Sequence, residues 1–151
     1  RSDGPRSYLG WGKSHGLGTG LGLIMGAKLA KPEKFCVNFM GDAAFGMTGL
    51  DFETAVRSNI PICTVVLNND DMAVEVPHME LSNDRFGSRA LYGRYADMAR
   101  AMGGWSERVD DPKDVGPALE RARKATEDGN SALLEFVTSS EMAKSNLRAF
   151  S

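Results

Sequence analysis

Three short apolar segments, separated by stretches with helical spacing, constrain the fold of this chain more than any other feature. They are residues 35–40 (FCVNFM), 62–67 (ICTVVL) and 132–137 (ALLEFV), and each has the length and composition of a strand that is buried on both faces of a parallel sheet. A weaker strand is expected at 105–109. Strands that alternate with helices favour an α/β fold, in which a parallel sheet carries helices on both faces.

Four helices are expected between and beside these strands. Their predicted limits are Leu17 to Pro32, a capping box at Thr48-Gly49-Leu50-Asp51 to about Ser58, Tyr95 to Gly103-Gly104, and the N-cap Asp111 with Pro112 to Gly129. The first of them contains glycines at positions 18, 20, 22 and 26. Glycine lowers helix propensity, so another backbone or a ligand is expected to come very close there.

The length of 151 residues fits one domain, which we place at residues 1–151. Within it, residues 1–16 are predicted to be an irregular N-terminal segment, and residues 139–151 a polar tail. The polar segment 69–90 has no clear periodicity, and a loop of that length is usually functional or mobile. The chain begins with Arg1 rather than methionine, which either processing or excision from a longer chain would explain.

The charge balance and the lack of long apolar stretches exclude some classes of partner. The chain has 18 Lys and Arg against 20 Asp and Glu, and this near-neutral balance, without basic clusters, argues against a nucleic-acid or anionic-membrane partner. No apolar stretch reaches the length that a membrane span needs.

Cys36 and Cys63 are expected to be buried free thiols, with a disulfide between strands as the alternative. The N-terminus shows no secretory leader, so a cytoplasmic location is expected.

Polar residues follow the two strongest central strands. Gly41-Asp42 ends one strand and Asn68-Asn69 ends the next, so the two pairs meet at one edge of the sheet if the strands are neighbours. Carboxylate and amide oxygens suit Mg²⁺ or Ca²⁺ and do not suit zinc. A single charged ligand favours Mg²⁺ held jointly with a phosphate group, and a helix expected after Ala43-Ala44 would favour an anion at its start. The alternative is that Asp42 and Asn69 are ordinary turn formers.

A resemblance to a known family rests on several segments. They are Gly16-Leu17-Gly18, residues 26–32, Gly41-Asp42-Ala43-Ala44-Phe45, residues 53–57, Ile60-Pro61 and Val65-Val66-Leu67-Asn68-Asn69, with Asn69 lying 27 residues after Asp42. Together they resemble the thiamine-diphosphate signature of the acetolactate synthase and 2-oxo acid decarboxylase superfamily. The resemblance extends over residues 10–138, nearly the whole chain. It implies that this is the part of a larger enzyme that binds the diphosphate end of thiamine diphosphate.

The resemblance also implies roles for individual residues. Mg²⁺ would be bound by Asp42, by the side chain of Asn69 and by the backbone carbonyl of Asp71, and the N–H groups of Ala43, Ala44 and Val74 would hold diphosphate oxygens. Leu17 would wedge between the two rings of the cofactor and bend it, while the carbonyl of His15 and the N–H of Leu17 would pair with the aminopyrimidine edge. The chain departs from the family pattern at three of these positions: Ala43 and Asp71 stand where glycine is usual, and His15 where a small residue is common. Asp71 would bring a second carboxylate to the metal.

Two further residues are candidates for catalysis. Glu75 aligns with an acidic residue that assists proton transfer in some decarboxylases of the family, and the alternative for a lone glutamate in a polar loop is a solvated charge. His78 follows three residues later, where a mobile lid would present it to substrate, and its alternative is an ordinary surface histidine.

The resemblance implies a partner as well. Family members need a glutamate that protonates the pyrimidine ring and that lies on a separate pyrimidine-binding domain, normally of another subunit, so a homo-oligomer is expected. This chain alone is therefore expected to bind cofactor weakly or not at all, and not to turn over.

Among activities, carboligation of two 2-oxo acids, as in acetolactate synthase, leads. The alternatives are simple 2-oxo acid decarboxylation, 2-hydroxyacyl-CoA lysis or a non-catalytic remnant of the fold. A dinucleotide-binding loop is disfavoured, because its pattern needs a sixth-position glycine where this chain has Leu21, Leu23 or Met25.

Overall fold

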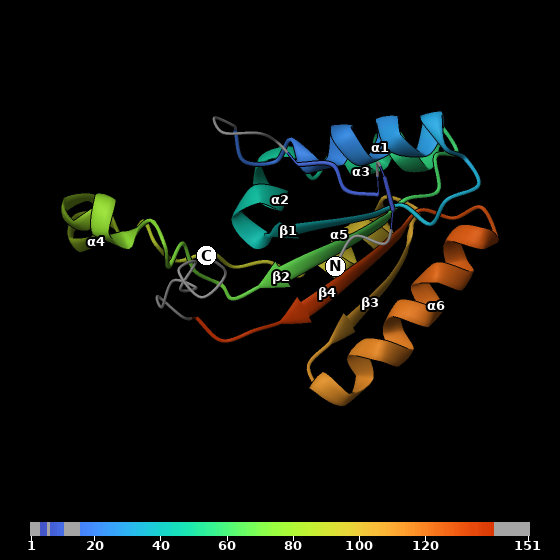
Figure 1. The fold of residues 1–151 in the computed structure, drawn as a ribbon. Coiled ribbons are helices and arrows are strands. Elements are labelled where there is room, and N and C mark those ends of the chain that lie inside the picture. The colour runs from blue at the N-terminus through green and yellow to red at the C-terminus, as the bar shows by residue number, and fades with distance from the viewer. Residues whose placement is uncertain (1–3, 6, 11–15, 141–151) are drawn as a thin grey trace.

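The sheet has four strands, all parallel. The computed structural model describes residues 4–5, 7–10 and 16–140. In that part of the chain the strands are β1 (Val37–Gly41), β2 (Cys63–Asn68), β3 (Trp105–Val109) and β4 (Ala132–Val137), in the spatial order β1-β2-β4-β3 (Figure 1). The register places Gly41 of β1 opposite Leu67 of β2. The carboxyl ends of these two neighbouring strands therefore lie level, at the same edge of the sheet.

Helices cover both faces of the sheet, as the sequence predicts. The helical elements are α1 (Gly20–Ala30), α2 (Asp42–Thr48), α3 (Asp51–Arg57), η1 (Val76–His78), α4 (Glu80–Phe86), α5 (Tyr95–Ala101), η2 (Pro112–Asp114) and α6 (Val115–Glu127). On one face α6 packs against β3 and β4, and on the other α1, α2, α3 and α5 form a second layer (Figure 1). The fold is α/β.

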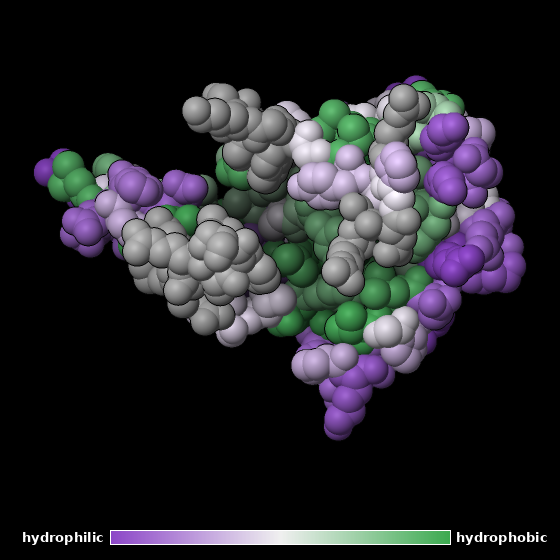
Figure 2. Space-filling view, in the orientation of Figure 1, coloured by the Kyte–Doolittle hydropathy of each residue, from purple (hydrophilic) through white to green (hydrophobic). Residues whose placement is uncertain are grey.

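Alternate side chains of the central strands enter two separate cores. Val66 and Leu133 lie in the core beneath α2, α3 and α5, whereas Val65 and Leu134 lie beneath α6. All four side chains are fully buried, which explains why the strands are apolar runs without alternation. Helix α6 does not cover all of its face of the sheet. Phe39 of β1 lies on this face and is 64% exposed. Figure 2 shows hydrophobic side chains gathered beside α6 on this face.

Two local predictions about helix starts are wrong. The first helix begins at Gly20 rather than Leu17, because Gly18 adopts a positive φ of 91° that a helix does not allow. The predicted capping box does not form: Thr48 is the last residue of α2, and its hydroxyl donates to the carbonyl oxygen of Gly18 at 2.8 Å. Helix α3 follows with Leu50 at its N-cap and no side-chain cap.

The close approach expected at the glycines of the first helix occurs at two of them. A Cβ on Gly18 would lie 2.5 Å from the Thr48 methyl carbon, and one on Gly20 would lie 2.5 Å from Asn38 Oδ1. Gly22 and Gly26 have open space instead. The absence of a side chain at Gly18 thus allows the segment before α1 to lie directly against Thr48 of α2.

The remaining predictions concern the loop, the thiols and the membrane. Segment 69–90, which has no periodicity in the sequence, contains η1 and α4, and Figure 1 shows α4 on an arm that projects from the sheet. Cys36 and Cys63 are buried free thiols, and burial raises the pKa of Cys63 to about 12. No described helix is long and apolar enough to cross a bilayer.

Candidate metal and diphosphate site

The two polar strand ends meet at the carboxyl edge of β1 and β2. Asp42, the residue after β1, accepts a hydrogen bond from the backbone N–H of Asn69 at 3.2 Å through Oδ2. Its other oxygen accepts from the N–H of Ala43 at 2.8 Å. The structure therefore brings Asp42 and Asn69, which are far apart in the sequence, into direct contact.

Asp42 is a buried carboxylate that has no cationic partner among the described residues. Only 3% of the residue is exposed, and among the described residues no Lys, Arg or His side chain forms an ion pair with it. Burial raises the pKa of Asp42 above its ordinary value, and the backbone N–H groups that surround the carboxylate offset part of this shift. Because a buried charge is costly unless it is paired, a cation at this position would stabilise the ionised form.

The turn after β2 carries the other predicted ligands. Asn69 Oδ1 accepts from the N–H of Asp71 at 3.1 Å, and Asn68 Oδ1 accepts from the N–H of Asp70 at 3.1 Å. Asp70 adopts a left-handed φ of 54°, a conformation that aspartate tolerates better than most residues. An amide oxygen has two lone pairs, so Asn69 Oδ1 keeps one for a cation.

The side chain of Asp71 is engaged elsewhere. Its carboxylate accepts from Arg89 Nε at 2.9 Å and forms an ion pair with the same guanidinium, and Ser140 donates to it as well. The hydrogen bond from Arg89 lowers the pKa of Asp71 below its ordinary value. The second carboxylate expected beside a metal is thus paired with an arginine, which leaves the backbone carbonyl of Asp71 as the ligand it can offer.

The predicted diphosphate and pyrimidine contacts are distributed around this edge. Ala43 and Ala44 lie in the first turn of α2, and Val74 is 54% exposed in the turn before η1. Leu17 is 38% exposed and precedes Gly18, whose carbonyl accepts from Thr48 of α2. His15 lies outside the described residues.

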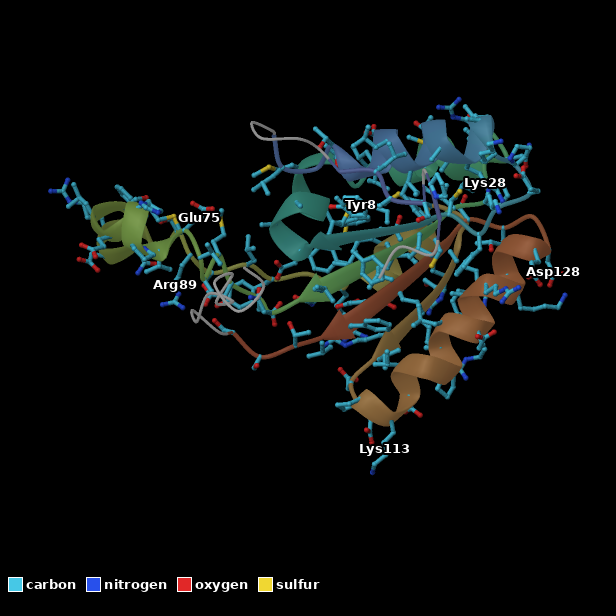
Figure 3. All side chains as sticks on the ribbon, in the orientation of Figure 1. Tyr8, Lys28, Glu75, Arg89, Lys113 and Asp128 are labelled. Carbon is cyan, nitrogen blue, oxygen red and sulfur yellow. The ribbon has the colours of Figure 1, made fainter. Side chains whose placement is uncertain are left out.

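Glu75 and His78 are not brought to Asp42. Both are exposed, and the carbonyl of Glu75 accepts the N–H of His78 at 2.8 Å at the start of η1. Figure 3 shows Glu75 on the arm that leads to α4, with Arg89 nearby. Among the described residues neither side chain forms a hydrogen bond with the residues that surround Asp42.

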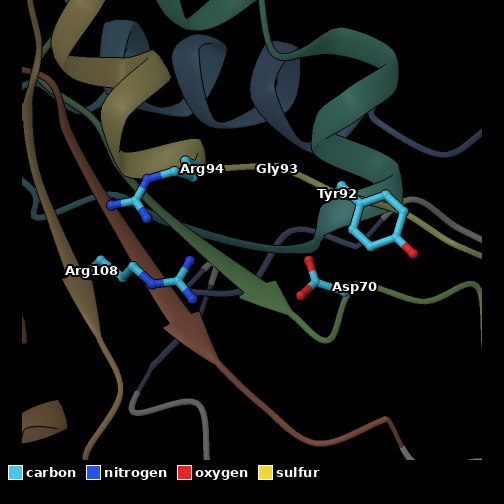
Figure 4. Close-up of a pocket in the computed structure, with 5 residues that line it drawn as sticks. All are labelled: Asp70, Tyr92, Gly93, Arg94 and Arg108. Carbon is cyan, nitrogen blue, oxygen red and sulfur yellow. The ribbon is translucent and has the colours of Figure 1, made fainter.

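A cavity that the sequence did not predict lies between the turn after β2, the segment before α5 and strand β3. It has a volume of about 460 Å³, and its lining residues are Asp70, Tyr92, Gly93, Arg94 and Arg108 (Figure 4). Arg108 is paired with Glu135, a fully buried residue of β4. The sequence feature that could have indicated this buried pair is the single charged residue, Glu135, inside the apolar run 132–137.

The donor set at Asp42 is suited to one kind of cation. No three His, Cys, Asp or Glu side chains cluster as metal ligands within the described part of the chain. One carboxylate, one amide oxygen and one carbonyl are hard oxygen ligands that leave several coordination positions open. Mg²⁺ retains water and shares phosphate oxygens in such sites, so these residues fit Mg²⁺ with a phosphorylated ligand.

Comparisons with known proteins identify the family of this chain as thiamine pyrophosphate enzymes. The family described as "Thiamine pyrophosphate enzyme, C-terminal TPP binding domain" matches residues 1–136. A probable acetolactate synthase of Mycobacterium bovis is 37% identical over 129 residues, which cover 78% of this chain and 22% of that protein. A sulfoacetaldehyde acetyltransferase of Alcaligenes xylosoxydans xylosoxydans is 34% identical over 145 residues, 94% of this chain and 24% of that protein.

A third relative and a solved structure extend the comparison. The 2-hydroxyacyl-CoA lyase of Oryza sativa is 30% identical over 138 residues, 80% of this chain and 22% of that protein. The thiamine diphosphate-dependent 4-hydroxybenzoylformate decarboxylase of Rhodococcus jostii RHA1 has the same fold, with a TM-score of 0.70 at 22% identity over 84% of this chain and 24% of that one. The chain therefore spans about a quarter of the length of these relatives.

Proposed function

Because the chain belongs to the family of C-terminal TPP-binding domains of thiamine pyrophosphate enzymes, we propose that it binds thiamine diphosphate and Mg²⁺ in an acetolactate synthase-like enzyme that carboligates or decarboxylates 2-oxo acids. The observation that carries this proposal is the hydrogen bond from the backbone N–H of Asn69 to the buried Asp42 carboxylate, which brings the two residues together at the ends of β1 and β2. Residues 1–151 would be one domain of that larger enzyme.

Within this site, each residue has a defined task. Asp42, the side chain of Asn69 and the carbonyl of Asp71 would hold Mg²⁺, and the cation would in turn neutralise both the buried carboxylate and the diphosphate. The N–H groups near Ala43, Ala44 and Val74 would donate to diphosphate oxygens, with the N–H of Ala43 shared with Asp42 Oδ1. Leu17 would support the bend between the two rings, and the backbone of His15 would contact the aminopyrimidine. When bound, thiamine diphosphate supplies a nucleophilic carbon and an electron sink for making or breaking a bond next to a carbonyl group.

A complete active site needs more than this chain. We propose a pyrimidine-binding domain, on another chain or another segment, that contributes the activating glutamate, and a homo-oligomer in the cytoplasm that brings the two domains together. Glu75 lies on the arm before α4 (Figure 3), and His78 is the last residue of η1 in the same segment. They would contact the small 2-oxo acid substrate only after another domain covers that arm.

A second activity has a specific observation in its favour. The lyase relative from Oryza sativa has an identity of 30%, close to that of the synthase and transferase relatives. Cleavage of a 2-hydroxyacyl-CoA by the same cofactor is therefore the alternative activity. A non-catalytic remnant of the fold is disfavoured, because Asp42 and Asn69 are both present and in contact.

Thermal unfolding of the chain with cofactor tests the proposed function. Mg²⁺ together with thiamine diphosphate is expected to raise Tm, whereas neither alone does so, and thiamine without its diphosphate has no effect. At about ten times Kd the stabilisation is about 1.4 kcal/mol. Without the pyrimidine-binding domain we expect Kd in the millimolar range, about −4 kcal/mol of binding free energy. An equal shift without a divalent cation contradicts the proposal. So does the absence of a shift at about 10 mM of each component in both this chain and the full-length enzyme that carries the pyrimidine-binding domain.

A further inference from the structure

A charged side chain lies at the centre of the sheet, away from the residues that would touch cofactor. Glu135 of β4 is fully buried and is aligned with Val66 of β2 on one side and Arg108 of β3 on the other. Both of its oxygens are satisfied: Oε2 accepts from the N–H of Ala96 at 2.8 Å, and Oε1 accepts from Asn68 Nδ2 at 2.8 Å and pairs with Arg108. A buried charge with this many partners is tolerated, and removing one partner is costly.

Asn68 connects this carboxylate to the turn that holds the predicted ligands. Its side-chain nitrogen donates to Glu135 Oε1 and, at 3.4 Å, to the carbonyl of Gly93. With its nitrogen held on that side, the amide presents Oδ1 to the N–H of Asp70 at 3.1 Å. That bond closes the left-handed turn at Asp70, which lies between Asn69 and Asp71. Glu135 thus orients the side chain that shapes this turn.

We propose that Glu135 is a positioning residue for the cation site. By fixing the Asn68 amide it sets the turn that carries the proposed ligands Asn69 Oδ1 and the Asp71 carbonyl, without itself touching cation or cofactor. This inference rests on the proposed function of those three residues. Partners that orient metal ligands in this way typically change metal affinity by about 10- to 100-fold when they are replaced.

Residue 135 must accept hydrogen bonds at both of its terminal atoms, which explains why a carboxylate is present there. Three donors converge on Glu135, from Asn68, Arg108 and Ala96. A glutamine has one oxygen and one NH₂ group, so in either orientation its NH₂ group faces at least one of these donors. If the oxygen is kept toward Ala96, the NH₂ group repels the Asn68 amide and releases the turn.

The experiment compares Glu135→Gln with a control variant on the same strand. Leu134 is the residue before Glu135 in β4 and is also fully buried, but it packs beneath α6 on the opposite face of the sheet. Mn²⁺ binding to the 151-residue chain is measured by electron paramagnetic resonance in the presence of inorganic pyrophosphate. We expect Glu135→Gln to raise the Kd for Mn²⁺ about tenfold or more. Leu134→Ala is expected to lower Tm while leaving that Kd within about twofold.

A second measurement separates positioning from general loosening. Amide hydrogen exchange at Asp70 is expected to accelerate in Glu135→Gln and not in Leu134→Ala, because only the first variant releases the Asn68 side chain. If Glu135→Gln does not fold, Asn68→Ala removes both the contact with Glu135 and the oxygen that accepts the Asp70 N–H, and it is expected to raise Kd by at least a similar factor.

The outcomes distinguish this inference from the function on which it rests. An unchanged Kd in folded Glu135→Gln, or in Asn68→Ala, overturns the positioning role while the wild-type site stands. Equal increases in Glu135→Gln and Leu134→Ala overturn it too. A wild-type chain that does not bind Mn²⁺ with pyrophosphate overturns the proposed function first, and the inference with it.

Discussion

Replacing Asp42 with asparagine is expected to reduce Mn²⁺ affinity in the presence of pyrophosphate by at least about 100-fold, or roughly 2.7 kcal/mol. Asp42 is the one charged side chain among the proposed ligands that is free to bind a cation, because the carboxylate of Asp71 is paired with Arg89. Asparagine preserves the volume and one acceptor oxygen, so the change removes the charge and turns an NH₂ group toward the backbone N–H of either Ala43 or Asn69. Electron paramagnetic resonance titration of Mn²⁺ measures the loss directly.

Asp70→Asn is the matched control for this prediction. Asp70 is an exposed neighbour of the proposed ligands, and its φ of 54° is one that asparagine tolerates. Its backbone N–H still donates to Asn68 after the change, and an exposed charge is screened by salt. We expect at most about a threefold change in Kd for this variant. Similar losses in both variants would mean that the loop attracts cations by its net charge, without ligation by Asp42.

Phe45→Ala is expected to lower the free energy of unfolding by about 3–5 kcal/mol. Phe45 lies in α2, the helix that begins at Asp42, and its side chain is fully buried. Its ring packs edge to face against Tyr95 of α5, with 5.5 Å between centroids and an interplanar angle of 79°. Truncation would remove this contact and leave a cavity beneath the site. Urea unfolding followed by circular dichroism measures the change.

Phe39→Ala provides the comparison for the stability prediction. The same residue type lies on β1, but Phe39 is 64% exposed and belongs to neither core. Its truncation is expected to cost less than about 1 kcal/mol. If both variants lower the free energy of unfolding by similar amounts, the burial of the Phe45 ring is not what stabilises the edge of the sheet at Asp42 and Asn69.

The strands were predictable because burial on both faces leaves a strong signal in sequence. The predicted runs 105–109 and 132–137 coincide with β3 and β4, and the other two runs differ from β1 and β2 by a residue or two. The helix starts were less predictable, because they depend on distant contacts. Thr48 looks like a cap from its neighbours in sequence, yet its hydroxyl donates to Gly18, 30 residues away. Local pattern cannot reveal such a partner.

The meeting of Asp42 and Asn69 could be expected from sequence, since neighbouring parallel strands end at one edge. The pairing of Asp71 with Arg89 could not, because the arginine lies 18 residues further along the chain, beyond η1 and α4, in a segment without periodicity in its sequence. The role of Glu135 is not predictable from sequence for a different reason: a charge inside an apolar strand indicates a buried network but does not identify its partners. Asn68, Ala96 and Arg108 reach it from three separate elements.

Anomalous X-ray scattering from crystals grown with Mn²⁺ and pyrophosphate tests the central claim most directly. A peak is expected within about 2.1 Å of a carboxylate oxygen of Asp42, Asn69 Oδ1 and the carbonyl oxygen of Asp71, with phosphate oxygens completing the coordination. A peak elsewhere, or none in contact with both Asp42 and Asn69 when solution titration shows saturation, would contradict the account.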